Sequence, residues 1–216
     1  MRIYLAFILC LLLACKKENQ NYISRFTIIN AVPNSSAFTL IVGKDVIDST
    51  VSYGIPKYNL PAAAGTTDVR WKLNGAADFD SSFFADLPNA SDFSLIFYDS
   101  INRFKSVLLR DNWKQPASKL KGYIRFFPLI IGANQQQLAN DTNKILVSAK
   151  TFASFTDAFT AIDTFTTKLR LYNGTKLLDS LPAATIQPGK SYSVYAIGIL
   201  NARGKNKPRM IMYEHE

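Results

Sequence analysis

The sequence has few of the residues that usually carry enzyme chemistry. It contains two cysteines and one histidine. Cys10 and Cys15 both lie at the N-terminus, so the chain beyond them has no disulfide, no cysteine nucleophile and no cysteine-rich metal site. His215 is the second-last residue, where chains usually fray, which argues against a Ser-His-Asp triad or a histidine metal site. We therefore predict that the protein is not an enzyme and uses no cofactor or metal.

The sequence also lacks an apolar run of the roughly 20 residues that a membrane-spanning helix needs. The N-terminal run covers residues 3–14, and its only polar side chain is Tyr4. This length is typical of the apolar region of a secretory signal. The alternative is a buried N-terminal helix, but such a helix carries one polar face and this run is apolar all round. The pattern predicts that residues 1–14 are a signal peptide that is removed.

The residues that end this run are Leu12-Leu13-Ala14-Cys15. They resemble the lipobox of bacterial lipoproteins. The resemblance implies cleavage between Ala14 and Cys15, a lipid on the Cys15 sulfur and acylation of the new amino terminus. Several acyl chains together anchor a protein stably in a bilayer. Residues 15–23 would then be a lipidated tether, and the protein would lie on the cell membrane or outer membrane, facing the periplasm or the cell surface.

Basic residues outnumber acidic ones, with 25 Lys and Arg against 16 Asp and Glu. Such an excess can indicate nucleic acid, anionic lipid or acidic glycan as a partner. Exported proteins rarely meet nucleic acid, and the basic residues are spread through loop-like sequence. We therefore predict a solvated basic surface and no nucleic-acid partner.

Four segments of the first half recur in the same order in the second, at an offset of about one hundred positions, which is typical of a duplicated domain. The pairs are 24–30 with 122–128, 66–75 with 165–174, 91–97 with 190–196, and 105–111 with 208–214. The boundary is predicted in a polar linker, residues 113–121, which contains Pro116. This division gives one domain at residues 24–112 and another at 122–216.

Within each half the apolar residues alternate with polar ones, as in Val69, Trp71 and Leu73. Short alternating segments between turn residues favour an all-β protein with a β-sandwich in each half. Asn74-Gly75 and Asn173-Gly174 are turn signals at matching positions, because both residue types tolerate positive φ.

Residues 151–165 are ambiguous, because their large apolar side chains recur at helical spacing. These residues are Phe152, Phe155, Phe159, Ile162 and Phe165. The matching stretch of the first half, 51–65, contains Pro56 and Pro61 and cannot form a regular helix. The repeat therefore favours strand and loop over helix at 151–165.

The first half contains a distinctive series of residues: the Ala31-Val32-Pro33 step, Gly43, the Tyr53-Gly54 pair, Tyr58 and the turn at 61–65. In these residues it resembles the domain-of-unknown-function family 4397 of bacterial envelope and secreted proteins. The resemblance implies two tandem immunoglobulin-like β-sandwich domains, and it brings no activity and no site. In the second half the aromatic-glycine pair becomes Phe152-Ala153 and the turn is absent, so the resemblance there depends on the internal repeat.

Two aspartates are the remaining candidates for chemistry. Asp78 and Asp80 would share one face of a strand about 7 Å apart, within reach of a glycosidase pair or a calcium ion. A polar hairpin at 74–82 explains them more simply, so a hydrolase that uses paired aspartates is the least favoured alternative.

Exposed aromatic rings are the best candidates for binding, because they stack on sugars or fill pockets of a partner. Trp113 lies in the linker, and Phe83 and Phe84 follow a turn; the alternative is that they pack at the contact between the domains. Together these features predict a membrane-anchored envelope lipoprotein that acts as a non-catalytic binding or scaffolding module for glycan or protein. An accessory subunit of a nutrient-uptake or adhesion assembly is the alternative.

Overall fold

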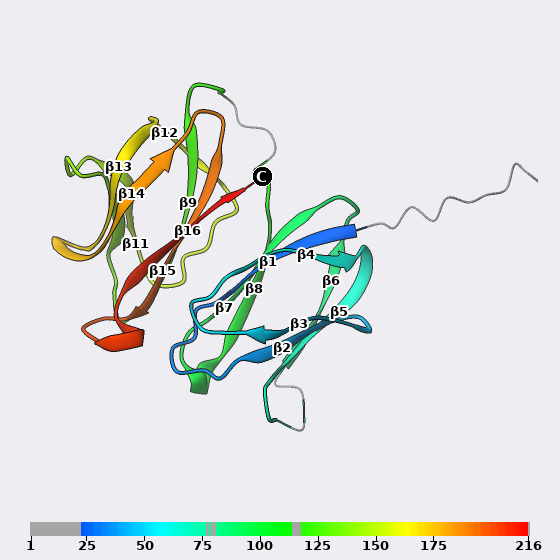
Figure 1. Ribbon diagram of the computed structural model, residues 1–216. Coiled ribbons are helices and arrows are strands. Elements are labelled where there is room, and N and C mark those ends of the chain that lie inside the picture. The colour runs from blue at the N-terminus through cyan, green and yellow to red at the C-terminus, as the bar shows by residue number, and fades with distance from the viewer. Residues whose placement is uncertain (1–22, 77, 79–80, 114–117, 216) are drawn as a thin grey trace, which may run out of the picture.

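The computed structural model describes residues 23–76, 78, 81–113 and 118–215 (Figure 1). The signal peptide, the lipobox with Cys15 and most of the tether lie outside these residues. No helix among the described residues is long and apolar enough to cross a membrane. The described chain is built from strands, and its only helices are two single 3-10 turns, Ile101–Arg103 and Gly204–Asn206. The predicted all-β fold is therefore confirmed.

The first half of the described chain contains eight strands. They are β1 (Ile23–Asn30), β2 (Phe38–Val42), β3 (Asp45–Val51), β4 (Lys57–Ala63), β5 (Gly65–Leu73), β6 (Ser81–Leu87), β7 (Asp92–Tyr98) and β8 (Lys105–Arg110). The second half contains eight more. They are β9 (Gly122–Ile131), β10 (Gln136–Ala139), β11 (Ile145–Lys150), β12 (Thr160–Ile162), β13 (Phe165–Asn173), β14 (Lys176–Ile186), β15 (Ser191–Ile199) and β16 (Arg209–His215).

Each half forms two four-stranded sheets, and the strand order is the same in both halves. The first half has sheets β4-β1-β7-β8 and β3-β2-β5-β6, and the second has β12-β9-β15-β16 and β11-β10-β13-β14. The four repeated sequence segments fall in β1 and β9, β5 and β13, β7 and β15, and β8 and β16. Each strand thus has its counterpart eight strands later, and Figure 1 shows the halves as two lobes.

The strand order differs from that of an immunoglobulin domain. In an immunoglobulin constant domain the first and second strands are neighbours in one sheet. Here the chain crosses to the facing sheet after β1, and β1 lies between β4 and β7, parallel to β7. The second half repeats this with β9 parallel to β15. The sandwich-like layering agrees with the sequence, and the strand order in each half differs from that of an immunoglobulin constant domain.

Each pair of sheets encloses its own hydrophobic core. In the first half the buried ring of Phe97 contacts those of Phe38 and Trp71, with centroids 4.4 and 5.0 Å away. In the second half the core gathers around Leu138, Leu171 and other aliphatic residues. Strand β2 shows the alternation expected of a strand with one covered face, since every second residue is buried.

A third buried cluster joins the two halves. Ile29 of β1 and Ile96 of β7 pack with residues of β9 and β15, and the rings of Phe127 and Tyr195 stack at 4.9 Å. Strands β9 and β15 are therefore buried on both faces along almost their whole length. The expected two-residue alternation is wrong for these strands, because each half covers the outer face of the other's sheet.

Residues 151–165 form turns and loop followed by the short strand β12, as the repeat predicted. Ala153 has a φ of +55°, and its N–H donates to the carbonyl oxygen of Pro128. Phe155 packs on the third cluster, 4.8 Å from the ring of Tyr98. The apolar residues of this segment therefore pack in different places, with Phe155 on the third cluster and Ile162 in the core of the second half, and they do not form one face of a helix. Both Asn-Gly turns are also confirmed, with positive φ at Gly75 and Gly174.

Candidate functional site

A buried polar cluster lies where the two halves meet. We call it the interface cluster; its members are Ser94, Asp111, Arg125, Ser193 and His215. The Arg125 side chain has no exposed surface and pairs with the Asp111 carboxylate at 2.8 Å. Arg125 lies on β9, and Asp111 follows directly after β8, so the ion pair bridges the halves.

Hydrogen bonds and aromatic rings compensate the Nε and Nη2 side of the buried guanidinium, whereas no described residue accepts a hydrogen bond from its buried Nη1. Its Nη2 donates to Ser94 Oγ at 3.1 Å and to Ser193 Oγ at 3.0 Å, and its Nε donates to Ser193 Oγ at 3.2 Å. Ser94 donates in turn to the Asp111 carboxylate at 3.0 Å. The guanidinium carbon lies 4.8 Å from the centre of the Phe127 ring and 4.7 Å from that of Phe159. Such a charge is tolerated inside a protein only when it is paired and hydrogen-bonded in this way.

The expectation that His215 lies in a frayed end is wrong. Strand β16 remains paired with β15 to its last residue, where His215 lies opposite Ser191. The imidazole is buried against the rings of Trp113, Phe159 and Tyr213. Burial, with a smaller contribution from the Arg125 charge, lowers the pKa of His215 to about 3. The histidine is therefore neutral at physiological pH.

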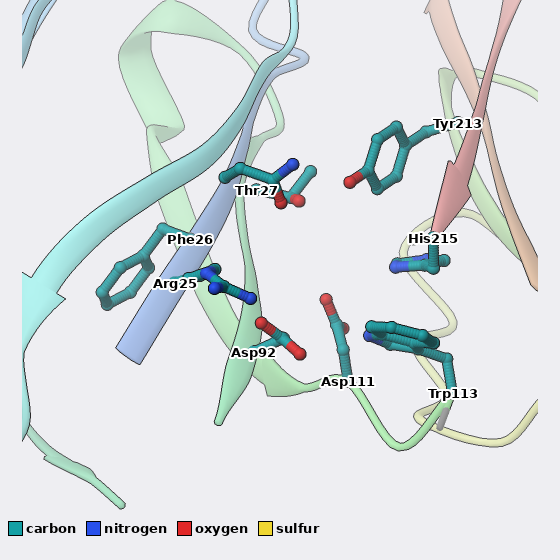
Figure 2. A pocket seen from close by; sticks show the side chains of 9 residues that line it. Arg25, Phe26, Thr27, Asp92, Asp111, Trp113, Tyr213 and His215 are labelled. Atoms are coloured by element: carbon teal, nitrogen blue, oxygen red, sulfur yellow. The ribbon is translucent and has the colours of Figure 1, made fainter. Parts of the chain in front are cut away.

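The His215 Nε2 lies 2.8 Å from Ser193 Oγ, a distance typical of a nucleophile and its base. Both side chains are buried, however, and the serine hydroxyl also accepts hydrogen bonds from Arg125. Figure 2 shows the adjoining cavity, toward which the side chains of Asp111, Tyr213 and His215 point from different strands and segments. The cavity measures about 10 Å³, the space of one water molecule. This geometry fits a contact that joins the halves and leaves no room for a substrate.

The three aromatic residues that the sequence predicted as binding residues differ in their exposure and packing. Trp113 is half-buried and stacks on His215 of β16 at 5.9 Å. Phe83 is half-buried and packs against Trp71 at 6.0 Å. Phe84, next to it on β6, is 82% exposed.

Of the two candidate aspartates, Asp80 lies outside the described residues. Asp78 is exposed. Within the described ranges, no group of three or more His, Cys, Asp and Glu side chains could hold a metal ion.

An open groove of about 490 Å³ runs between the edge strands β6 and β8. Residues 81–86 line one side, Val107 and Leu108 line the other, and Trp71 also contributes. The indole N–H of Trp71 is buried, and no described residue accepts a hydrogen bond from it. The groove therefore combines aromatic rings with a buried polar donor.

The equivalent position in the second half is closed. There the Met210 N–H of β16 donates to the Asp179 carboxylate of β14 at 2.7 Å, which draws the two edge strands together. Since the strand order of the two halves is the same, the open groove is specific to the first half.

Sequence reasoning missed the interface cluster. One signal was available, because Arg125 is the only charged residue in the ten-residue apolar strand Gly122–Ile131. A charge inside such a strand requires a buried partner. In comparisons with known proteins, no family model matches this chain, and no curated protein matches it either.

Proposed function

We propose that this protein is a lipid-anchored envelope lipoprotein whose two halves form a non-catalytic binding or scaffolding module for glycan or protein. The lipobox at Leu12–Cys15 supports the anchor and the location in the cell envelope. The buried interface supports a single rigid unit that presents its outer edges. An accessory role in a nutrient-uptake or adhesion assembly is the alternative, since it would use the same surfaces.

The proposal includes the domain division. Each pair of sheets is proposed as one β-sandwich domain, at residues 24–112 and 122–216, joined by the linker 113–121. Support comes from a separate hydrophobic core in each half. The domains would be immunoglobulin-like in having two packed sheets, with the strand order β4-β1-β7-β8 and β3-β2-β5-β6 as their own variant.

The single observation that carries the binding role is the groove beside β6. Its volume lies within the range of roughly 300–1,000 Å³ that is typical of ligand sites. Phe84 at its rim is 82% exposed, and covering a phenylalanine ring with a partner stabilises a complex by about 1.5–3 kcal/mol. By contrast, the Ser193–His215 pair lies inside the interface and does not face the groove.

We expect Phe84→Ala to weaken partner binding about tenfold or more, because it removes the exposed ring at the groove. Binding is measured with a glycan array and with pull-downs from envelope extracts, over a series of salt concentrations. Leu177→Ala is the matched control, because Leu177 is 49% exposed on β14 in the other half. Partner binding that is equally strong in Phe84→Ala would exclude the groove. Binding that is lost at high salt would show that the partner binds the basic surface and not the groove.

We expect the wild-type protein to fractionate with membranes and to carry lipid on Cys15. Cys15→Ala should remain an unlipidated precursor that keeps residues 1–14, because the lipid needs a thiol. Intact mass measurement of both proteins checks this. Soluble wild-type protein that begins at another residue would contradict the proposed lipid anchor. The binding role of the groove is tested separately, by Phe84→Ala.

A further inference from the structure

Strand β6 differs from the other sheet edges in the described part of the chain. Proteins protect exposed edges with short strands, bulges, prolines or charges, because unpaired backbone groups otherwise pair with another chain. Strand β12 has only three residues, and β3, β4, β11 and β14 all pair with register shifts. Strands β8 and β16 carry Lys105, Arg110 and Arg209. Seven of the eight edges are thus short, irregular or basic.

Strand β6 is less protected, since its only such feature is the single acidic charge of Asp86. It is seven residues long, contains no Lys, Arg or Pro, and pairs with β5 without a register shift. Every residue from 81 to 86 lines the groove. Because consecutive side chains point to opposite faces, a groove that touches all of them runs along the backbone edge of the strand. The groove therefore gives access to the free hydrogen-bonding edge of β6.

The sequence of β6, Ser-Ser-Phe-Phe-Ala-Asp-Leu, is self-complementary in an antiparallel pair centred on Phe84. In that register Phe84 faces Phe84, and Ser82 faces Asp86, all on one face of the sheet. On the other face Phe83 faces Ala85. Aromatic pairs are favourable across strands, and no like charges lie opposite each other. Ser82 can donate a hydrogen bond to the Asp86 carboxylate, and Ser81 faces Leu87 at the ends.

We infer that the partner for the β6 edge is β6 of a second copy of this chain. The two copies would be related by a two-fold axis through Phe84, and the sheets would join in the order β3-β2-β5-β6-β6-β5-β2-β3. The pairing would cover the exposed Phe84 rings. This inference rests on the proposed function in one respect, since it names the partner of the same groove; it does not depend on the lipid anchor.

The test uses the full-length chain with Cys10→Ala and Cys15→Ser, purified in mild detergent and followed by sedimentation across the micromolar range. We expect a monomer–dimer equilibrium. Phe84→Lys should raise the dissociation constant at least tenfold, because it places two lysines opposite each other. Leu177→Lys is the control and should leave the equilibrium unchanged. Circular dichroism confirms that both variants keep their strands.

Engineered cysteines test the register. Phe84→Cys should form a disulfide-linked dimer on oxidation. Ser82→Cys should cross-link with Asp86→Cys when the two variants are mixed, and neither should cross-link efficiently alone. A chain that stays monomeric, or a dimer that persists unchanged in Phe84→Lys, would overturn the inference. If the chain is monomeric and Phe84→Ala still abolishes binding of a glycan or another protein, the inference fails while the proposed function stands.

Discussion

Replacing Arg125 with methionine is expected to lower the free energy of unfolding by about 3–5 kcal/mol, because it leaves the Asp111 carboxylate buried without its partner. Methionine keeps much of the packing volume between Phe127 and Phe159. Burial already raises the pKa of Asp111, and Arg125 and Ser94 oppose that rise. In the variant the carboxyl is therefore expected to be protonated at a higher pH than in the wild type. Urea denaturation at neutral pH measures the loss.

The double variant Arg125→Met/Asp111→Asn should recover much of this stability, because it removes both charges together and keeps the shape of the site. The matched control is Lys144→Met, which breaks an ion pair with Asp163 at 2.8 Å whose side chains are 63% and 59% exposed. That variant should unfold like the wild type, since exposed pairs contribute little. A loss below about 1 kcal/mol in Arg125→Met would show that water reaches the pair in solution.

Acid is expected to destabilise the protein through His215. Its pKa is about 3 in the folded state, below its ordinary value of 6.5. Between these values the unfolded chain binds a proton that the folded chain does not, so stability falls as pH falls. The neutral histidine makes its full contribution to the free energy of unfolding above pH 6.5. This contribution decreases by about 1.4 kcal/mol per pH unit toward pH 3.

The variant His215→Gln isolates this effect, because glutamine cannot take up the proton but can still hydrogen-bond Ser193. The difference in unfolding free energy between wild type and variant should shrink or reverse as pH falls from 6.5 to 4. Because His215 is the only histidine of the chain, its imidazole NMR signals in untagged protein report this group alone. A titration midpoint near 6.5 in the folded protein would contradict the sealed interface.

Local patterns predicted much of the fold. The Asn-Gly turns and the loop at 151–165 depend on backbone preferences of neighbouring residues, and these are legible in one sequence. The repeated segments identified equivalent strands, because both halves bury the same strand faces. The strand order was not predictable in this way, since it depends on which sheet the chain enters after β1.

The interface cluster was not predictable because its partners are far apart in the chain. Arg125 and Ser193 are 68 positions apart, and Ser94 lies 31 positions from Arg125. Only the packing of one half on the other brings them together. The same packing covers His215, whose position in the sequence suggested a mobile end. Phe84 was predictable as an aromatic residue after a turn, but its exposure depends on the open edge of β6.

The third hydrophobic cluster has a consequence for the nascent chain. Strand β8 ends at Arg110, but the covering strand β15 ends only at Ile199. At usual rates of synthesis, roughly 5–20 s pass before those roughly 90 residues have been added. During that time the first half can close its own core while its outer face, with Ile29 and Ile96, has no partner. A growing chain in this state exposes an apolar face through which it can aggregate. Correct folding therefore depends on how soon the second half is synthesised, or on a chaperone that covers the face until then.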